Sequence, residues 1–343
     1  MAKHIAVVPC DGAGKEVVPE AVKVLRAVGA DLEFEDFKVD ADEYMRTGVP
    51  ISEATWKELA AADSILFGAV GDPRIEDPAY LAGVLLRLRF ELDLYVNLRP
   101  AKLYDDRLSP LRREDRRSVD LLVVRENTEG LYVGMGGRFK KGTTDEIATQ
   151  EELNTYGGVS RILEHAFGIA RREVVMVDKS NAMTFAGGLW QERWKAVAAK
   201  HPNVKTRHLL VDAMAMQLVK DPSQFDVIVT GNLFGDILSD LTAELIGGMG
   251  MAPSANINPK TGRGLFEPVH GTAPDIAGKG LVNPIGAILS GGMMIDHLGH
   301  RDMAQAIEAA VGSAIRAGEC TRDLGGSLST SQAGDAIVKR LKD

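Results

Sequence analysis

The sequence predicts an α/β protein in which helices cover both faces of a sheet. Short β-branched runs alternate with segments of helical period along almost the whole chain, as strand–helix–strand units do. The chain has 343 residues, more than one hydrophobic core usually spans, so we expect two substructures. Apolar residues make up 45% and charged residues 26%, the balance of an ordinary globular protein rather than a disordered one.

Charge and cysteine content exclude several classes of protein. Lys and Arg total 40 against 48 Asp and Glu, and this net charge of -8 argues against a general binder of nucleic acid or membrane surfaces. No apolar run approaches the roughly 18 residues of a membrane span, and residues 1–14 hold too short an apolar core for a signal peptide. Cys10 and Cys320 are too few for a disulfide scaffold or a cysteine-built zinc site. We therefore expect a cytoplasmic protein.

The individual elements follow from the spacing of apolar residues. β-branched runs predict strands over 4–9, 64–70, 119–125, 174–178, 205–211 and 225–230. Helical periodicity predicts helices over 15–28, 80–94, 301–318 and 330–341. Polar or glycine-rich stretches predict a solvated loop over 104–117, an extended arm or hairpin over 134–158, and a crossing between substructures over 251–264.

A glycine-containing turn joins the first predicted strand to the first helix. Gly12 and Gly14 stand where a dinucleotide-binding fingerprint begins, but its third glycine would fall on Val17. That glycine allows the helix to pack closely on the strand, so its absence disfavours a Rossmann site. The alternative is a tight turn that lines some other site, with any dinucleotide bound elsewhere.

Three acidic residues indicate a site for a divalent cation. Asp236 and Asp240 follow an apolar strand and stand four residues apart, so on a helix they share one face and repel each other. Asp212 ends another apolar run. Oxygen ligands of this kind suit Mg²⁺ or Mn²⁺ rather than zinc. The alternative makes Asp236 a helix N-cap and Asp240 a solvated side chain.

Three arginines are candidates for binding a carboxylate, and one of them stands at the end of a predicted strand. Arg125 ends the strand over 119–125, Arg99 precedes Pro100, and Arg89 lies in the helix over 80–94. Guanidinium groups that converge on one pocket would bind a di- or tricarboxylate, whereas each arginine alone is more often part of a surface ion pair.

Two further residues have the chemistry of an acid and a base. Lys179 directly follows the strand over 174–178, and Tyr132 comes seven residues after Arg125. Near a reacting substrate Lys179 would act as a base and Tyr132 as a proton donor, although either alone is more often structural or solvated. A last motif, residues 266–275 running on to 283–284, is dominated by turn residues whose backbone N–H groups can face a phosphate.

Taken together, these motifs resemble the β-decarboxylating dehydrogenase family, which includes isopropylmalate, isocitrate, homoisocitrate and tartrate/D-malate dehydrogenases. The most specific segments are 85–102, 124–132, 178–181, 212–216, 231–240 and 266–284. The resemblance implies two α/β substructures that share a central sheet, with an active-site cleft between them. A discontinuous nucleotide-binding domain would comprise 1–98 and 252–343. The inserted domain, 99–251, would carry the metal-site acids and a dimerisation arm at about 134–158.

The resemblance also implies a role for each candidate residue. The substrate would contact Arg89, Arg99, Arg125, Asp212, Leu85 and Leu86. The metal, Mg²⁺ or Mn²⁺, would be held by Asp212, Asp236 and Asp240, and catalysis would use Lys179 and Tyr132. The cofactor would contact Glu267, His270, Gly271, Thr272, Ala273, Pro274, Asp275 and Asn283. The active unit would be a homodimer in which Lys179 and Asp212 reach into the partner's site.

The residue after Ala273-Pro274 indicates NAD rather than NADP. NAD-using members of the family place an Asp there against the adenosine ribose, and this chain has Asp275. A carboxylate accepts hydrogen bonds from ribose hydroxyls and repels a 2′-phosphate. NADP-using relatives carry a Lys–Tyr pair where this chain has Asp275 and Ile276. Alternatively, Asp275 caps the turn over 276–278.

The substrate is expected to be a 2-hydroxy dicarboxylate or tricarboxylate, and the resemblance is closest to the isopropylmalate enzymes. Leu85 and Leu86 would form an apolar wall for the isopropyl group, and no Ser replaces them to hold the extra carboxylate of isocitrate. The expected reaction is NAD-dependent oxidation of 3-isopropylmalate to 2-oxo-4-methylpentanoate and CO₂, in leucine biosynthesis. Ala82, where isopropylmalate enzymes usually carry Glu, departs from that pattern.

Other segments keep alternatives open. Residues 127–130 resemble the homoisocitrate and tartrate branches, and 136–150 and 255–259 are similar to tartrate/D-malate dehydrogenases. Tartrate/D-malate is therefore the second candidate and homoisocitrate the third. A non-catalytic regulatory homologue belongs to a different class, and the intact Lys179, Tyr132 and aspartates argue against it.

Overall fold

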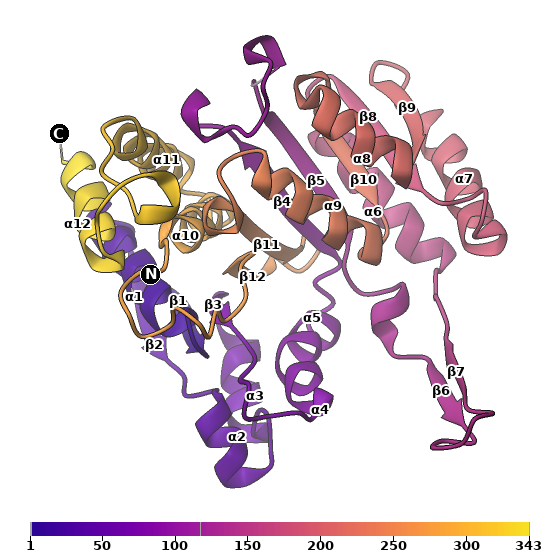
Figure 1. Ribbon diagram of the computed structural model, residues 1–343, viewed down its shortest axis with the longest axis horizontal. Helices are drawn as coiled ribbons and strands as arrows, with labels where there is room; N and C mark the ends of the chain where they lie inside the picture. The colour runs from indigo at the N-terminus through magenta and orange to yellow at the C-terminus, as the bar shows by residue number, and fades with distance from the viewer. Residues whose placement is uncertain (1, 117, 343) are drawn as a thin grey trace.

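The computed structural model describes residues 2–116 and 118–342; Arg117, the last residue of the predicted loop, lies outside it, as do Met1 and Asp343. A ten-stranded sheet runs through the molecule in the order β2-β1-β3-β12-β11-β4-β5-β10-β8-β9, flanked by helices (Figure 1). The strands are β1 Lys3–Cys10, β2 Leu32–Asp36, β3 Ser64–Ala69, β4 Val96–Lys102, β5 Asp120–Glu126, β8 Glu173–Asp178, β9 Lys205–Leu210, β10 Val227–Thr230, β11 Pro253–Asn258 and β12 Arg263–Pro268. This architecture confirms the predicted α/β class.

The sheet consists of two parallel blocks joined by antiparallel strands. Strands β2, β1, β3 and β12 pair in parallel, as do β5, β10, β8 and β9. Between the blocks, β11 pairs antiparallel with β12 and β4, and β4 pairs antiparallel with β5. The predicted division of the chain after residue 98 falls inside β4, and the assignment of two domains stays a prediction.

Helices pack on the sheet through their apolar sides and form, with it, one large hydrophobic core and a smaller one. They are α1 Gly14–Ala27, α2 Ala41–Thr47, α3 Glu53–Ala61, α4 Pro78–Leu81, α5 Arg87–Glu91, α6 Tyr156–Ile169, α7 Thr184–Ala198, α8 Val211–Lys220, α9 Asn232–Glu244, α10 Ile285–His297, α11 Arg301–Arg316 and α12 Thr330–Arg340. Within the described residues, no helix is long and apolar enough to cross a membrane.

The six predicted strands are present, with ends that differ by at most two residues. The single helix expected over 80–94 is wrong: α4 and α5 are separated by a π-helical turn at Ala82–Leu86. The arm is a hairpin of β6 Gly136–Phe139 and β7 Ile147–Gln150, which projects from the rest of the molecule (Figure 1), although residues 156–158 already belong to α6. The stretch predicted as a crossing forms β11 and the start of β12.

Candidate active site

Many of the residues singled out in the sequence line one cavity of about 220 Å³. They come from the π-helical turn and α5, from β4 and β5, from a 3₁₀ turn after β5, from α9, and from the end of β12 with the segment that follows it. The predicted residues in this cavity are Leu85, Leu86, Arg89, Arg99, Arg125, Tyr132, Asp236, Glu267, His270 and Gly271. Segments far apart in the sequence thus bring the predicted substrate-binding groups together.

Arg125 is the most deeply buried of the three arginines. Its Nε and Nη2 donate to Asn232 Oδ1 at 3.0 and 2.7 Å, and its Nη1 bonds Asp236 Oδ1. Both acceptors stand at the start of α9, which approaches Arg125 closely because residue 235 is Gly: a Cβ there would lie 2.5 Å from Arg125 Cγ. Asn232 and Gly235 therefore fix the direction in which the guanidinium points, and the sequence prediction included neither.

Arg99 and Arg89 are held in the same way by buried acceptors. Arg99 Nη1 donates to Ser239 Oγ at 2.7 Å and to Asp236 Oδ1 at 3.3 Å. Arg89 Nη2 donates to Glu267 Oε1 at 2.7 Å. The Nε atoms of both arginines are buried and find no hydrogen-bond partner among the described residues. The cluster thus keeps donors to spare for an anionic ligand.

Burial and the repulsion between neighbouring guanidinium groups disfavour the charged forms of Arg125 and Arg99. Burial, together with the neighbouring Arg99 and Arg89, lowers the pKa of Arg125 to about 9. Burial also lowers the pKa of Arg99, and Asp236 only partly offsets this effect. A carboxylate ligand would relieve the repulsion, so the cluster favours a compact substrate with more than one carboxylate.

Tyr132 and Asp236 form a hydrogen-bonded pair beside the arginines. Tyr132 lies in the short 3₁₀ turn Leu131–Val133, and its hydroxyl donates to Asp236 Oδ2 at 2.7 Å. Burial and the hydrogen bond to Asp236 raise the pKa of Tyr132, so this side chain keeps its proton at neutral pH. Burial alone would raise the pKa of Asp236, but Arg125 and Arg99 lower it on balance. A protonated phenol therefore faces the cavity that an anionic substrate would enter.

One wall of the cavity is apolar. Leu85 and Leu86 lie in the π-helical turn, one turn before Arg89, and Leu81 and Val70 extend the wall they form. π-Helical turns are rare and occur often at functional sites. The sequence prediction included Leu85 and Leu86 but missed Leu81, which ends α4, and Val70, which directly follows β3.

Lys179 and Asp212 lie apart from this cavity. Lys179 follows β8 and Asp212 lies in the first turn of α8, and Lys179 Nζ donates to Asp212 Oδ1 at 2.6 Å. This hydrogen bond lowers the pKa of Asp212. Lys179 lines a separate, very small cavity with Asp178, Gly231 and Phe234. Within one chain, the pair does not reach the arginine cluster.

The three predicted metal ligands do not meet within one chain. Asp236 and Asp240 lie on successive turns of α9, whereas Asp212 bonds Lys179 on α8. Burial raises the pKa of Asp240, and the like charge of Asp236 adds to the effect. Among the described residues no group of three metal-ligating side chains is close enough to hold an ion. Within one chain, the α9 pair could supply two oxygen ligands for a hard divalent cation but not a third.

The predicted nucleotide segment begins inside the cavity and leaves it. Glu267, His270 and Gly271 line the cavity, and Nε2 of His270 is buried without a hydrogen-bond partner in the part of the chain described. The rest of the segment, Thr272, Ala273, Pro274 and Asp275, continues beyond the lining, as far as Asn283. Asn283 is buried, and its Nδ2 donates to Asp323 Oδ2 at 2.9 Å.

A buried polar chain connects the arginine cluster to the centre of the sheet. Asn256 of β11 donates to Glu267 Oε1 at 2.9 Å, the same oxygen that accepts from Arg89. Asn97 of β4 and Asn127 both donate to Asn256 Oδ1 at 3.0 Å. The sequence prediction assigned Glu267 to the cofactor alone and missed its role as the partner of Arg89.

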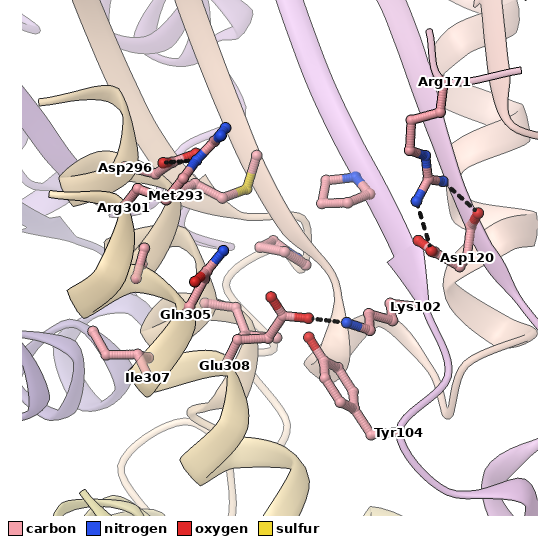
Figure 2. A pocket seen from close by; sticks show the side chains of 15 residues that line it. Lys102, Tyr104, Asp120, Arg171, Met293, Asp296, Arg301, Gln305, Ile307 and Glu308 are labelled. Atoms are coloured by element: carbon pink, nitrogen blue, oxygen red, sulfur yellow. Dashed lines mark hydrogen bonds and ion pairs between the residues drawn. The ribbon is translucent and has the colours of Figure 1, made fainter. Parts of the chain in front are cut away.

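A second, larger cavity of about 390 Å³ lies between strands β4–β5 and helices α10–α11 (Figure 2). Its charged residues bond one another: Lys102 pairs with Glu308, Arg171 with Asp120 at 2.8 Å, and Arg301 with Asp296 at 3.3 Å (Figure 2). Its lining includes none of the predicted site residues. With none of the predicted residues in its lining, this cavity is not the candidate active site.

Comparisons with known proteins agree with this geometry. The family model described as isocitrate/isopropylmalate dehydrogenase matches residues 4–337. A 3-isopropylmalate dehydrogenase of Thermobifida fusca is 45% identical, with 99% of this chain and 98% of that protein covered. One from Leifsonia xyli is 47% identical, with 98% and 97% covered. The crystal structure of isocitrate dehydrogenase from Methylococcus capsulatus superimposes with a TM-score of 0.92 at 37% identity, over 100% of both chains.

Proposed function

Because the chain belongs to the isocitrate/isopropylmalate dehydrogenase family and is a decarboxylating dehydrogenase of small dicarboxylates, we propose that its substrate is 3-isopropylmalate and its oxidant NAD. The product would be 2-oxo-4-methylpentanoate, a precursor of leucine, with release of CO₂. The observation that carries the proposal is the juxtaposition of three buried arginines with the apolar wall of Leu85 and Leu86.

The cavity offers complementary surfaces for the two parts of this substrate. The arginines supply guanidinium donors for the malate carboxylates, and the leucine side chains supply an apolar surface for an isopropyl group. A further carboxylate, as in isocitrate, would face Leu85 and Leu86 without a hydrogen-bond partner there, which is costly in a buried site. D-malate or tartrate would leave this apolar wall unused, and therefore rank second.

The chain's own residues supply acid–base groups for the reaction. Lys179 of the partner subunit would accept the proton of the C2 hydroxyl while C2 loses its hydride. Loss of CO₂ from the neighbouring carbon then leaves an enolate, and Tyr132, protonated and hydrogen-bonded to Asp236, would donate the proton that this enolate needs. When bound, NAD would accept the hydride, and Mg²⁺ or Mn²⁺, held by Asp236, Asp240 and a partner's Asp212, would stabilise negative charge on the C2 oxygen.

The surface of the chain supports a homodimer. The helix after Lys179, α7, exposes Phe185 in its first turn, and α8, which carries Asp212, exposes Met216. The hairpin arm also exposes Phe139 and Ile147. Apolar surface of this extent is typical of an interface, and a second copy placed there would bring Lys179 and Asp212 to a site that each chain leaves incomplete.

A substrate panel tests the proposal. With Mg²⁺ and NAD, formation of NADH should be fastest, by kcat/KM, for 3-isopropylmalate, and slower for D-malate, tartrate, homoisocitrate and isocitrate. A preference for D-malate or tartrate would replace the proposed substrate. The absence of turnover with all five, by a chain that binds NAD and metal, would instead indicate a non-catalytic homologue.

The cofactor preference is tested in the same assay. Asp275 would repel a 2′-phosphate and leave it without a donor, which corresponds to roughly 2–4 kcal/mol of discrimination against NADP. Steady-state kcat/KM for NAD should therefore exceed that for NADP at equal pH and salt. A ratio near one, or one in favour of NADP, would overturn this part of the proposal.

A further inference from the structure

The glycine-containing turn between β1 and α1 takes no part in the proposed reaction, yet it contacts the predicted nucleotide segment. The N–H of Ala13 donates to the carbonyl oxygen of Thr272 at 2.8 Å. A Cβ on Gly12, which has a φ of +48°, would lie 2.2 Å from the same oxygen. The two segments thus approach at a backbone distance that only glycine allows at position 12.

Glu16, in the first turn of α1, makes the second contact. Its Oε2 accepts the N–H of Gly280 at 2.8 Å, and its Oε1 accepts the N–H of Gly278. Both glycines have positive φ, +78° and +66° respectively for Gly278 and Gly280. Backbone N–H groups in such conformations converge on a single anion, and here that anion is a carboxylate of the same chain.

These contacts bracket the turn that carries Asp275. The N–H groups of Ile276 and Ala277 both donate to the Ala273 carbonyl, at 3.1 and 2.9 Å, and so form a compact turn. The side chain of Lys279 closes it by donating to the Asp275 carbonyl at 2.7 Å. Thr272, before Asp275, is bonded to the turn that precedes α1, and the residues after Asp275 are bonded to α1 itself through Glu16.

We infer that Glu16 is a positioning residue for the dinucleotide: it holds the turn over 273–280 in the conformation that presents Asp275 to the adenosine ribose. The inference rests on the proposed cofactor role of this segment. If Glu16 is replaced, the turn samples more conformations, and the apparent Kd rises in inverse proportion to the binding-competent fraction that remains. Glu16 does not line the cavity that holds the arginines and Tyr132, so the chemical step should be unaffected.

The test compares Glu16→Gln with Glu33→Gln. Glu16→Gln keeps the size of the side chain, but its amide NH₂ group would face one of the two backbone N–H groups that donate to the Glu16 carboxylate. The second removes an exposed carboxylate on β2 and serves as the matched control. Binding of NADH, followed by its fluorescence, should weaken about tenfold in Glu16→Gln, the equivalent of roughly 1.4 kcal/mol. KM for NAD should rise alike, whereas kcat at saturating NAD and KM for the dicarboxylate should match those of the control.

A second variant and a second measurement make the outcome decisive. Gly278→Ala strains the same contact from the loop side, because a side chain is disfavoured at this φ. If Glu16 acts through Gly278, the two substitutions together should weaken NADH binding less than the product of their separate effects. Hydrogen exchange of the amides over 276–281, measured without cofactor, should be faster in Glu16→Gln than in Glu33→Gln.

The outcomes separate this inference from the proposed function. Wild-type protein that binds no NADH would overturn both. Wild-type binding together with unchanged NADH affinity in Glu16→Gln would overturn the inference alone, even if exchange of the turn became faster. A fall in kcat with no change in cofactor affinity would also overturn it, because Glu16 would then act on the chemical step.

Discussion

The arginine cluster and the Lys179–Asp212 pair belong to the same proposed site, but the chain completes only the first. Arg125 is 1% exposed, and its side chain bonds Asn232 and Asp236. The side chains of Lys179 and Asp212 are 29% and 62% exposed and bond each other. A buried charge is costly unless the fold supplies a partner, so residues of the same chain fix the arginines. The Lys179–Asp212 ion pair is partly exposed to solvent, and such pairs are held less rigidly.

The arginine cluster and the Lys179–Asp212 pair also differ in how closely their surroundings are packed. The arginines lie under α9, whose Gly235 was needed to bring the helix close. Around Lys179 and Asp212, large apolar side chains face solvent: Phe185 is 95% exposed and Met216, four residues after Asp212 on α8, is 67% exposed. We therefore propose that folding organises one half of the site, whereas association of two chains organises the other half.

Loss of Lys179, which we propose acts in the partner's site, should reduce activity more than any other substitution. Lys179→Ala should lower kcat by about 10²–10⁴, the usual contribution of general acid–base catalysis. The affinity for the divalent ion should change little, because Lys179 is not a predicted ligand. Steady-state kinetics with a metal titration measures both quantities, and near-full turnover in the variant would remove Lys179 as the base.

A mixed dimer tests directly whether Lys179 acts in the site of the partner subunit. A Lys179→Ala protomer keeps an intact arginine cluster, and an Arg125→Lys protomer keeps an intact Lys179. Co-expression of the two, each nearly inactive alone, should restore roughly a quarter of wild-type activity, because about half of the dimers are hybrids with one complete site. No recovery in purified hybrid dimers would place Lys179 in the site of its own chain.

Asp236 belongs to both halves, since it pairs with the arginines and is a predicted metal ligand. Asp236→Asn should weaken the apparent affinity for Mg²⁺ or Mn²⁺ by at least the ~10–100-fold that loss of an outer-shell partner costs. Activity against metal concentration measures this, with Glu244→Gln, an exposed carboxylate at the end of the same helix, as the control. Wild-type protein that turns over at full rate after treatment with EDTA would contradict the whole metal assignment.

The half that folding completes was also the half that the sequence predicted in more detail. Arg125 at the end of a predicted strand and Arg89 on a predicted helix indicated a carboxylate site, and the family resemblance added Leu85 and Leu86. The acceptors Asn232 and Ser239 were missed, because their role depends on how α9 packs against β4 and β5. Such packing between distant segments leaves no pattern in a single sequence.

Features that depend on backbone geometry could not be predicted from the sequence either. The π-helical turn at Ala82–Leu86 differs from an α-helix in its hydrogen-bond register, which residue type does not encode. The sheet order could not be predicted either, since β11 and β12 enter it between β4 and β3, from far along the chain. Gly12 allows the close approach of Thr272, a residue that only the fold brings beside it.

We expect the smallest effect, on stability rather than activity, for Asp226, a buried acid outside the site whose carboxylate accepts several hydrogen bonds. Asp226 precedes β10, at the amino end of this parallel block, whereas Arg125 lies at the carboxyl end of β5. Asp226 is buried, and its Oδ2 accepts hydrogen bonds from the backbone N–H groups of Arg171, Arg172 and Glu173 at 2.8, 2.6 and 3.2 Å. Burial alone would raise the pKa of Asp226, but these bonds and the Arg171 guanidinium lower it on balance.

The sign of the pH dependence follows from that shift. An acid whose pKa is lower in the folded state than in the unfolded chain stabilises the fold above the unfolded value, about 3.9, and this stabilisation is lost as the pH falls through the folded value. The free energy of unfolding should therefore decrease from about pH 5 downward in wild type and less steeply in Asp226→Asn. At pH 7 the variant should be less stable by about 1–3 kcal/mol, because an amide nitrogen would face backbone donors. Urea unfolding at several pH values measures both, and equal slopes for the two proteins would show that the bonds to Asp226 do not lower its pKa.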